Sequence, residues 1–170
     1  EIYEDDRGSF IESWKRDIFN SLTNNRYSFV QDNQSISSIG VLRGMHYQIP
    51  PYEQGKLVRC SKGAVLDVII DLRKHSKTFG LWGAIKLESK KYNQLWIPPG
   101  FAHGFLSLEM DTIFEYKVTN YYSKSHERAL IWNDPNINIK WPEINTKIKV
   151  SKKDSQAYSF KELCQFNDFF

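Results

Sequence analysis

Short stretches in which apolar and polar residues alternate dominate the chain, and this pattern predicts β-strands. Most stretches are rich in β-branched or aromatic residues and end at Gly, Pro, Ser or Asn. Strands this short and this closely spaced indicate a sandwich or barrel. The predicted strands lie at residues 40–48, 56–60, 64–72, 82–87, 94–97, 104–108 and 113–119.

One helix is predicted near the start of the chain, where Ile11, Trp14, Ile18 and Leu22 recur at helical spacing. It follows a predicted turn at residues 5–8. The chain opens at Glu1 directly before this turn. We therefore expect some N-terminal residues, with a first strand, to be missing.

Alternation also predicts which side chains share a strand face, because residues two apart point the same way. Asp67 and Tyr116 fall on faces that otherwise read as core, so each is either hydrogen-bonded within the core or turned toward a ligand cavity. The predicted rows are His46 with Gln48; Lys56 with Val58 and Cys60; Asp67 with Ile69 and Asp71; and Phe114 with Tyr116 and Val118.

Length and charge narrow the class of protein. With 170 residues and 41% hydrophobic composition, one domain over residues 1–170 is expected. The formal net charge of +3 comes without a Lys/Arg block, which argues against nucleic-acid binding. We expect no membrane span, because no stretch reaches roughly 18 apolar residues. Cys60 and Cys164 show no disulfide or zinc spacing, which favours the cytoplasm.

Proton transfer next to a carbonyl is the chemistry that the inward-facing polar groups favour. An imidazole such as that of His46 can accept a proton near neutral pH, the phenol of Tyr116 can donate one, and the ammonium of Lys56 can hold an enolate oxygen. Taken singly, each of these residues is more often structural. No serine or cysteine lies in a recognisable nucleophile motif.

A bound metal is the main competing use of two strand histidines, His46 and His103. Metal-binding β-barrels of this kind carry a His-x-His pair followed by Glu, whereas this chain has His46-Tyr47-Gln48 and then Gln54-Gly55-Lys56. Amide, phenol and ammonium groups leave too few deprotonatable ligands. We therefore predict no required metal, and no Gly-rich dinucleotide motif indicates another cofactor.

These residues resemble a family, the deoxy-sugar epimerases typified by dTDP-4-dehydrorhamnose 3,5-epimerase, a metal-free branch of the cupins. The resemblance covers about residues 5 to 154 in family order. It is carried by Asp6-Arg7-Gly8, Gln31-Asp32-Asn33, Gly40-Val41-Leu42-Arg43-Gly44-Met45-His46-Tyr47-Gln48, Gln54-Gly55-Lys56-Leu57-Val58-Arg59, Trp96-Ile97-Pro98-Pro99-Gly100-Phe101-Ala102-His103-Gly104-Phe105, Tyr116-Lys117-Val118-Thr119-Asn120-Tyr121-Tyr122, Trp132-Asn133-Asp134-Pro135 and Ser151-Lys152-Lys153-Asp154.

The resemblance implies an all-β, cupin-type antiparallel jelly-roll barrel with a few short helices, and a homodimer whose N-terminal residues help shape the partner's site. It makes His46 the general base, Asp154 its orienting carboxylate, Tyr116 the acid and Lys56 the enolate stabiliser. The implied substrate is a dTDP-linked sugar. The implied substrate-binding residues are Arg7, Glu12, Gln31, Asn33, Arg43, Asp67, His103, Tyr122, Glu127 and Lys153.

The implied activity is inversion of C3 and C5 of dTDP-4-keto-6-deoxyglucose, giving dTDP-4-dehydrorhamnose for surface-polysaccharide synthesis. Three alternatives stay open. A sibling enzyme inverts only C3 or only C5, or acts on another nucleotide-linked 4-keto sugar. A non-catalytic sugar-nucleotide binding module would be expected to lack His46, Tyr116 or Lys56, and a metal-dependent cupin oxygenase is disfavoured by the missing ligands.

Overall fold

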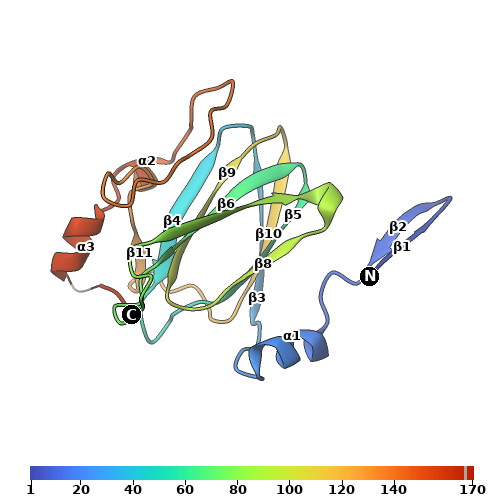
Figure 1. Ribbon diagram of the computed structural model, residues 1–170, viewed down its shortest axis with the longest axis horizontal. Coiled ribbons are helices and arrows are strands. Elements are labelled where there is room, and N and C mark those ends of the chain that lie inside the picture. Colours follow the sequence, from blue (N-terminus) through green and yellow to red (C-terminus); the bar gives the residue numbers. More distant parts are fainter. Residues whose placement is uncertain (167) are drawn as a thin grey trace.

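Two antiparallel sheets form the body of the computed structural model, which describes residues 1–166 and 168–170 (Figure 1). The four-stranded sheet has the order β3 (Gln31–Ser37), β10 (Thr112–Val118), β5 (Lys56–Lys62), β8 (Gln94–Ile97). The five-stranded sheet has the order β11 (Glu127–Ala129), β4 (Leu42–Gln48), β9 (Phe101–Ser107), β6 (Ala64–Asp71), β7 (Trp82–Glu88). This arrangement confirms the predicted cupin-type jelly roll with few, short helices.

The residues between the sheets and those behind the five-stranded sheet form separate cores, because alternate strand residues point to opposite faces. The first core joins the two sheets and comprises Val58, Cys60, Val65, Leu87, Ile97, Phe105 and Phe114. The second packs residues of β4, β6 and β9 against the C-terminal third of the chain, and comprises Met45, Tyr47, Val68, Ile70, Leu72, Ala102, Leu130, Ile137, Ile139, Leu163 and Phe169.

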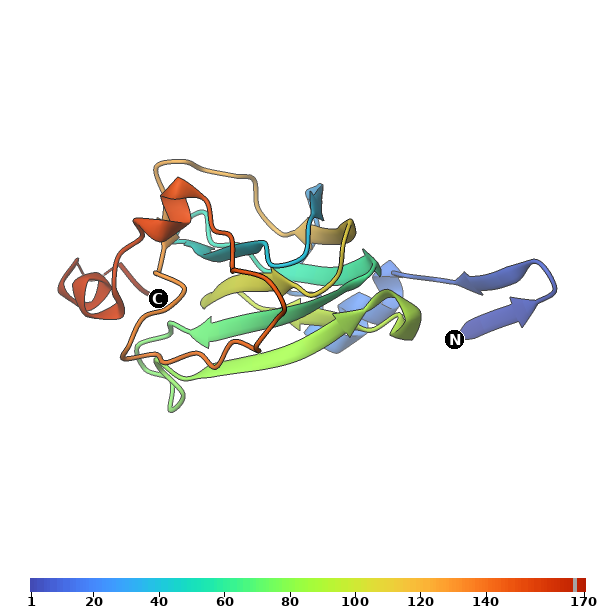
Figure 2. The same cartoon turned by 90° about the horizontal axis from the view of Figure 1, so that it is seen from above.

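The C-terminal segment therefore covers the outer face of the five-stranded sheet (Figures 1 and 2). It contains the short helices α2 (Lys152–Ser155) and α3 (Phe160–Phe166). Isolated parallel bridges join Val41 to Lys149 and Leu130 to Tyr158. The first bridge brings the residues that precede α2 beside the start of β4.

The N-terminal hairpin of β1 (Ile2–Asp5) and β2 (Gly8–Ile11) projects away from the barrel (Figures 1 and 2). Its turn falls where the sequence predicted one. Tyr3 and Phe10 pack on each other with ring centroids 6.3 Å apart, yet both side chains are largely exposed. Ser9 contacts the body through a 2.6 Å hydrogen bond to Tyr92, which follows the 3₁₀ turn η1 (Ser89–Lys91).

The predicted helix is present, but it starts later than the spacing indicated and buries a different face. Helix α1 (Arg16–Thr23) begins after Ile11 and Trp14, and Ile18 and Leu22 are exposed rather than buried. Phe19 is the residue that packs instead, 4.6 Å from the ring of Phe29 and 5.0 Å from that of Trp96. The aromatic contact of Phe19 with the four-stranded sheet therefore decides which face of α1 is buried. The spacing of the aliphatic residues indicated a different face.

The seven predicted strands are all present, with ends shifted by up to three residues. The strands that alternation did not predict are β1, β2, β3 and β11. Strand β3 reads Gln-Asp-Asn-Gln-Ser-Ile-Ser, a polar sequence at a sheet edge, and such residues are depleted in strands. Within the described residues, no helix is long and apolar enough to cross a bilayer.

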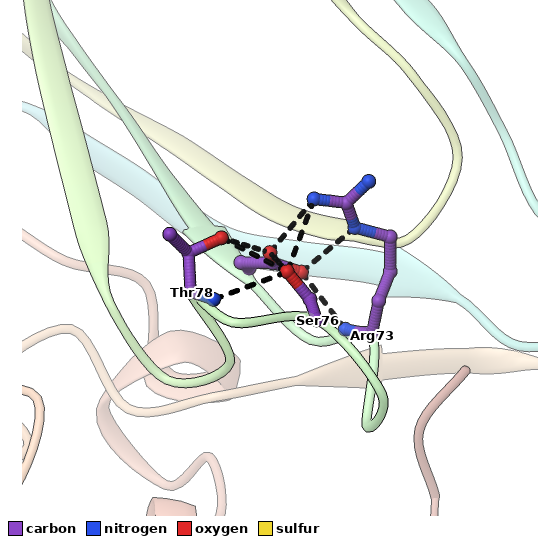
Figure 3. A network of polar contacts seen from close by, with 4 residues as sticks. Arg73, Ser76 and Thr78 are labelled. Atoms are coloured by element: carbon purple, nitrogen blue, oxygen red, sulfur yellow. Dashed lines mark hydrogen bonds and ion pairs between the residues drawn. The ribbon is translucent and has the colours of Figure 1, made fainter.

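The turn after β6, residues 71–78, is held by one buried carboxylate (Figure 3). Asp71 accepts hydrogen bonds from the backbone and guanidinium of Arg73 at 2.8–2.9 Å and from the hydroxyls of Ser76 and Thr78 at 2.6 Å. These contacts hold the pKa of Asp71 well below its usual range although burial alone would raise it. Arg73 also lies 4.5 Å over the ring of Phe101. The turn is thus tied to the start of β9.

Candidate active site

A cavity of about 610 Å³ opens between the two sheets. Its walls come from β3, β4, β5, β9 and β10 and from the C-terminal segment at and before α2. Most side chains named from the sequence as catalytic reach this one space. The sequence-predicted residues among its lining are Asn33, Arg43, His46, Lys56, His103, Tyr116, Lys153 and Asp154.

His46 and Asp154 form a dyad at the cavity wall. His46 Nε2 lies 2.7 Å from Asp154 Oδ1, and the Gly44 amide donates to Asp154 Oδ2 at 3.5 Å. Ser151 caps α2 by accepting a hydrogen bond from the Asp154 amide, so the carboxylate sits on a fixed backbone. Burial opposes ionisation of Asp154, but the contacts with His46 outweigh it and lower its pKa. A charged carboxylate can therefore orient the imidazole.

Lys56 approaches from the four-stranded sheet. Its ammonium donates to the His46 carbonyl at 3.3 Å, and its side chain is nearly buried. Burial lowers the pKa of Lys56 to about 8, and the charges of Asp67 and Glu127 offset part of that effect. The group is therefore a cation at neutral pH with little solvent around it, the condition under which a positive charge best stabilises a developing enolate.

A second histidine–carboxylate pair stands next to the first. His103 on β9 is the cross-strand partner of His46, and its Nε2 lies 2.8 Å from Asp67 Oδ2. Burial lowers the pKa of His103 although Asp67 acts in the opposite direction. Asp67 itself is fully buried, is not among the cavity-lining residues and leaves Oδ1 without a hydrogen-bond partner. It supports His103 from behind, whereas the sequence placed it at the substrate.

Tyr116 faces the cavity from β10, between Asn33 of β3 and Val58 of β5. Burial raises the pKa of Tyr116, so its phenol keeps its proton at neutral pH and can donate it. His46 belongs to the five-stranded sheet and Tyr116 to the four-stranded sheet. The two groups thus reach one cavity from opposing walls.

Glu127 contacts two more of the predicted residues, one of which, Lys153, lines the cavity. Lys153 pairs with its carboxylate at 2.6 Å, and the Tyr122 hydroxyl donates to it at 2.7 Å. Burial would raise the pKa of Glu127, but these two contacts lower it. Arg43 stays free of acidic partners among the described contacts, and donates to Ser37 Oγ at 3.2 Å.

Besides Asp67, five predicted residues are not among the cavity-lining residues: Arg7, Glu12, Gln31, Tyr122 and Glu127. Arg7 lies on the projecting hairpin and pairs with Asp5, while Glu12 directly follows the hairpin. Gln31 donates to Asn33 Oδ1 at 2.7 Å and is not among the lining residues. Gln31 therefore contacts a lining residue without lining the cavity itself.

Alternation could have revealed one lining residue that sequence reasoning missed. Ser35 continues the row of Gln31 and Asn33 on β3, and its buried Oγ has no hydrogen-bond partner. Lys149 also lines the cavity, but it lies in an irregular segment without a periodic pattern. Phe105 and Phe114 add an apolar wall, with ring centroids 4.2 Å apart.

A second, smaller hollow of about 280 Å³ lies on the outer face of the four-stranded sheet, beside Trp14. Its charged groups neutralise one another, because Arg59 pairs with Glu115 and Lys117 with Asp32. Among the described residues, no group of three or more His, Cys, Asp or Glu side chains is placed to hold a metal ion.

A jelly roll whose cavity joins a His–carboxylate dyad, a desolvated ammonium and a facing phenol defines the class: a carbohydrate epimerase, an isomerase. The family model described as dTDP-4-dehydrorhamnose 3,5-epimerase matches residues 1–162. A dTDP-4-dehydrorhamnose 3,5-epimerase of Shigella flexneri is 47% identical over 165 residues, 97% of this chain and 90% of the relative. The chain belongs to the dTDP-4-dehydrorhamnose 3,5-epimerase family.

Solved structures of epimerases have the same fold as this chain. The epimerase of Legionella pneumophila in complex with dTDP-4-keto-L-rhamnose superposes with a TM-score of 0.92 at 41% identity, covering 99% of this chain and 88% of that one. A 3′-monoepimerase of Streptomyces bikiniensis in complex with dTDP-quinovose gives a TM-score of 0.94 at 28% identity, covering 99% and 85%. The same fold thus serves enzymes that invert one carbon, so the fold alone does not fix the number of inversions.

Proposed function

We propose that this chain inverts C3 and C5 of dTDP-4-keto-6-deoxyglucose through enolate intermediates, giving dTDP-4-dehydrorhamnose. One observation carries the proposal: the His46–Asp154 dyad and Tyr116 face one cavity from opposing sheets. Inversion needs a base on one face of the sugar ring and an acid on the other. The 47% identity to a 3,5-epimerase favours double inversion over a single one.

The 4-keto group is what makes the carbon acids reactive. His46 removes the proton from C5 or C3, the C–H electron pair moves into the ring carbon–C4 bond, and charge develops on the 4-oxygen. Lys56 stabilises that oxygen, and Tyr116 then delivers its phenolic proton to the opposite face of the same carbon. His46 then releases the abstracted proton to solvent, and the Tyr116 phenolate takes up a proton from solvent. No net oxidation occurs, so the reaction requires no redox cofactor.

The nucleotide and diphosphate need cationic and amide groups near the mouth of the cavity. Arg43, whose contacts are to neutral oxygens, and Lys153 suit the diphosphate, and Asn33 suits a neighbouring hydroxyl or base edge. Tyr122 and Glu127 stand beside Lys153 and would be rearranged by an anionic group that competes for its ammonium.

The projecting hairpin supports a homodimer. An isolated two-stranded hairpin is marginal in water, and this one exposes Ile2, Tyr3 and Phe10. It also carries Arg7 away from the cavity of its own chain. We infer that it packs on a second copy, where Arg7 and Glu12 complete the partner's nucleotide site. We also propose a cytoplasmic location, which suits two free cysteines and a nucleotide-sugar substrate.

The test is solvent-deuterium incorporation into dTDP-4-keto-6-deoxyglucose, followed separately at C3 and C5 by NMR. Label and inversion at both carbons are expected. Inversion at one carbon selects a mono-epimerase, and tight binding without label selects a binding module.

Two variants assign the roles. His46→Ala is expected to abolish exchange while the fold is retained, and Tyr116→Phe is expected to impair inversion more than exchange. Exchange at a near-normal rate in His46→Ala would remove His46 from its role, and equal losses in Tyr116→Phe would do the same for Tyr116 as the reprotonating acid.

A further inference from the structure

The connections that follow β4 and β10 lie against each other at one end of the barrel. Residues 49–55 join β4 to β5, and residues 119–126 join β10 to β11. Gly55 and Thr119 exchange two hydrogen bonds at 2.8 and 3.0 Å, and the Ile49 amide donates to the His126 carbonyl at 3.0 Å. One connection therefore links the strand of His46 to that of Lys56, and the other links the strand of Tyr116 to that of Glu127.

Gln48 is bonded to both connections at once. Its amide nitrogen donates to the Tyr52 carbonyl at 2.5 Å and to the Tyr121 carbonyl at 3.2 Å, and its amide oxygen accepts from the Ser123 amide at 2.7 Å. The side chain is only 3% exposed. Its two N–H donors and its oxygen are thus all satisfied by backbone atoms of the two connections.

The hydrogen bonds of Gln48 link the two sheets. Gln48 is the last residue of β4, in the five-stranded sheet, whereas Tyr121 and Ser123 follow β10 of the four-stranded sheet. A buried amide that loses a partner incurs a penalty, so three simultaneous bonds favour one separation between the sheets at this end. His46 lies two residues before Gln48, and Tyr116 lies five residues before Tyr121.

We propose that Gln48 is a positioning residue that sets the spacing between the base and the acid across the sugar ring. The inference rests on the proposed function. Removal of a proton requires only His46 near the ring, whereas inversion also requires Tyr116 at the right distance from the opposite face. A looser spacing therefore impairs inversion more than exchange, because a displacement of about 1 Å at a reacting group can cost roughly 10²-fold in rate.

Gln48→Met, which keeps the length of the side chain and removes all three bonds, tests the proposal. The measured quantity is the ratio of deuterium-labelled, uninverted substrate to inverted product in D₂O. We expect this ratio to rise by about tenfold or more relative to the unaltered protein. Partial unfolding lowers both species in the same proportion, so a merely structural role leaves the ratio unchanged.

Gln54→Met is the matched control, because the Gln54 amide donates one hydrogen bond between the same connections, to the Asn120 carbonyl at 2.8 Å, and lies outside the strands. Its ratio is expected to match that of the unaltered protein. An unchanged ratio in Gln48→Met, or an equal rise in Gln54→Met, overturns the proposal.

If Gln48→Met does not fold, Gln48→Glu replaces it, since the carboxylate still accepts from Ser123 but cannot donate to the two carbonyls. An unchanged ratio in that variant also overturns the proposal. If the unaltered protein neither labels nor inverts the substrate, the proposed function fails instead.

Discussion

Asp67 and Asp71 lie four residues apart on β6, on the same face and almost without solvent exposure, yet their surroundings differ. Asp71, in the 71–78 turn, accepts five hydrogen bonds shared over both of its oxygens. Asp67, behind the cavity, has His103 on one oxygen and no partner on the other. An unpaired buried polar atom costs roughly 1–3 kcal/mol.

The difference separates a carboxylate that stabilises the fold from carboxylates that serve the cavity. Asp154 belongs with Asp67, since it orients a histidine that is itself partly exposed to the cavity. Around Asp71, every donor is a neighbour in sequence and none faces the cavity. Replacing each carboxylate by its amide therefore tests whether that carboxylate affects stability or activity.

The largest loss of activity is expected for Asp154→Asn. The amide can no longer act as a charged acceptor for His46 and favours the wrong tautomer, so deuterium exchange should fall by about 10³-fold or more, as for other His–carboxylate pairs. NMR-detected exchange measures it. Ser151→Ala, which removes the cap but keeps the carboxylate, is the control and should cost only about 1 kcal/mol of stability. Exchange within tenfold of normal in Asp154→Asn contradicts the assignment.

Asp67→Asn is expected to lower kcat by about 10²-fold, because His103 and Lys56 lose a nearby negative charge in a desolvated site. Stability should be unchanged or greater, since a fully buried charge with one partner is replaced by a neutral amide. Steady-state kinetics and urea unfolding test both halves. A loss of stability as large as that of the Asp71 variant would place the two carboxylates in one class.

Asp71→Asn should lower the free energy of unfolding by roughly 3 kcal/mol, because charged and hydroxyl donors lose a buried anion. Activity per folded molecule should stay normal. The folded-state pKa of Asp71 is depressed, so its stabilisation is present above about pH 4 and is lost as the pH falls toward that lower value. Urea unfolding across this range should show a weaker acid dependence in the variant; equal dependence would contradict it.

The smallest effect concerns Lys56 and the basic limb of the pH profile. With a pKa of about 8, Lys56 loses its charge as the pH rises through that value, so kcat/KM should fall by up to about tenfold per pH unit above it. Arginine remains charged there. In Lys56→Arg, the limb should move to higher pH even if the rate is lower. A limb that stays near pH 8 belongs to another group.

Much of the fold could be predicted because seven strands are short, rich in β-branched or aromatic residues and bounded by turn residues. Strand β3 could not be predicted, because its position at a sheet edge lets it stay polar. The buried face of the helix was predicted wrongly, because the orientation of the helix depends on a contact between Phe19 and Trp96.

Within the site, alternation alone placed His46, Lys56 and Tyr116 on inward faces. Asp154 came from the resemblance, since no local pattern connects residues 108 positions apart. The position of Asp67 behind His103 could not be predicted, because sequence gives the face of a strand but not the depth behind it. Arg7 and Glu12 also came from the resemblance, and the structure places them on or next to the projecting hairpin, outside the cavity lining.

The order of Asp154 and the barrel strands along the chain has a consequence for synthesis. During translation, every strand of the barrel emerges before the carboxylate that orients His46. A ribosome-bound chain with a largely formed jelly roll therefore has a histidine without its orienting partner. Docking of α2 therefore adds this partner after the last barrel strand has been made.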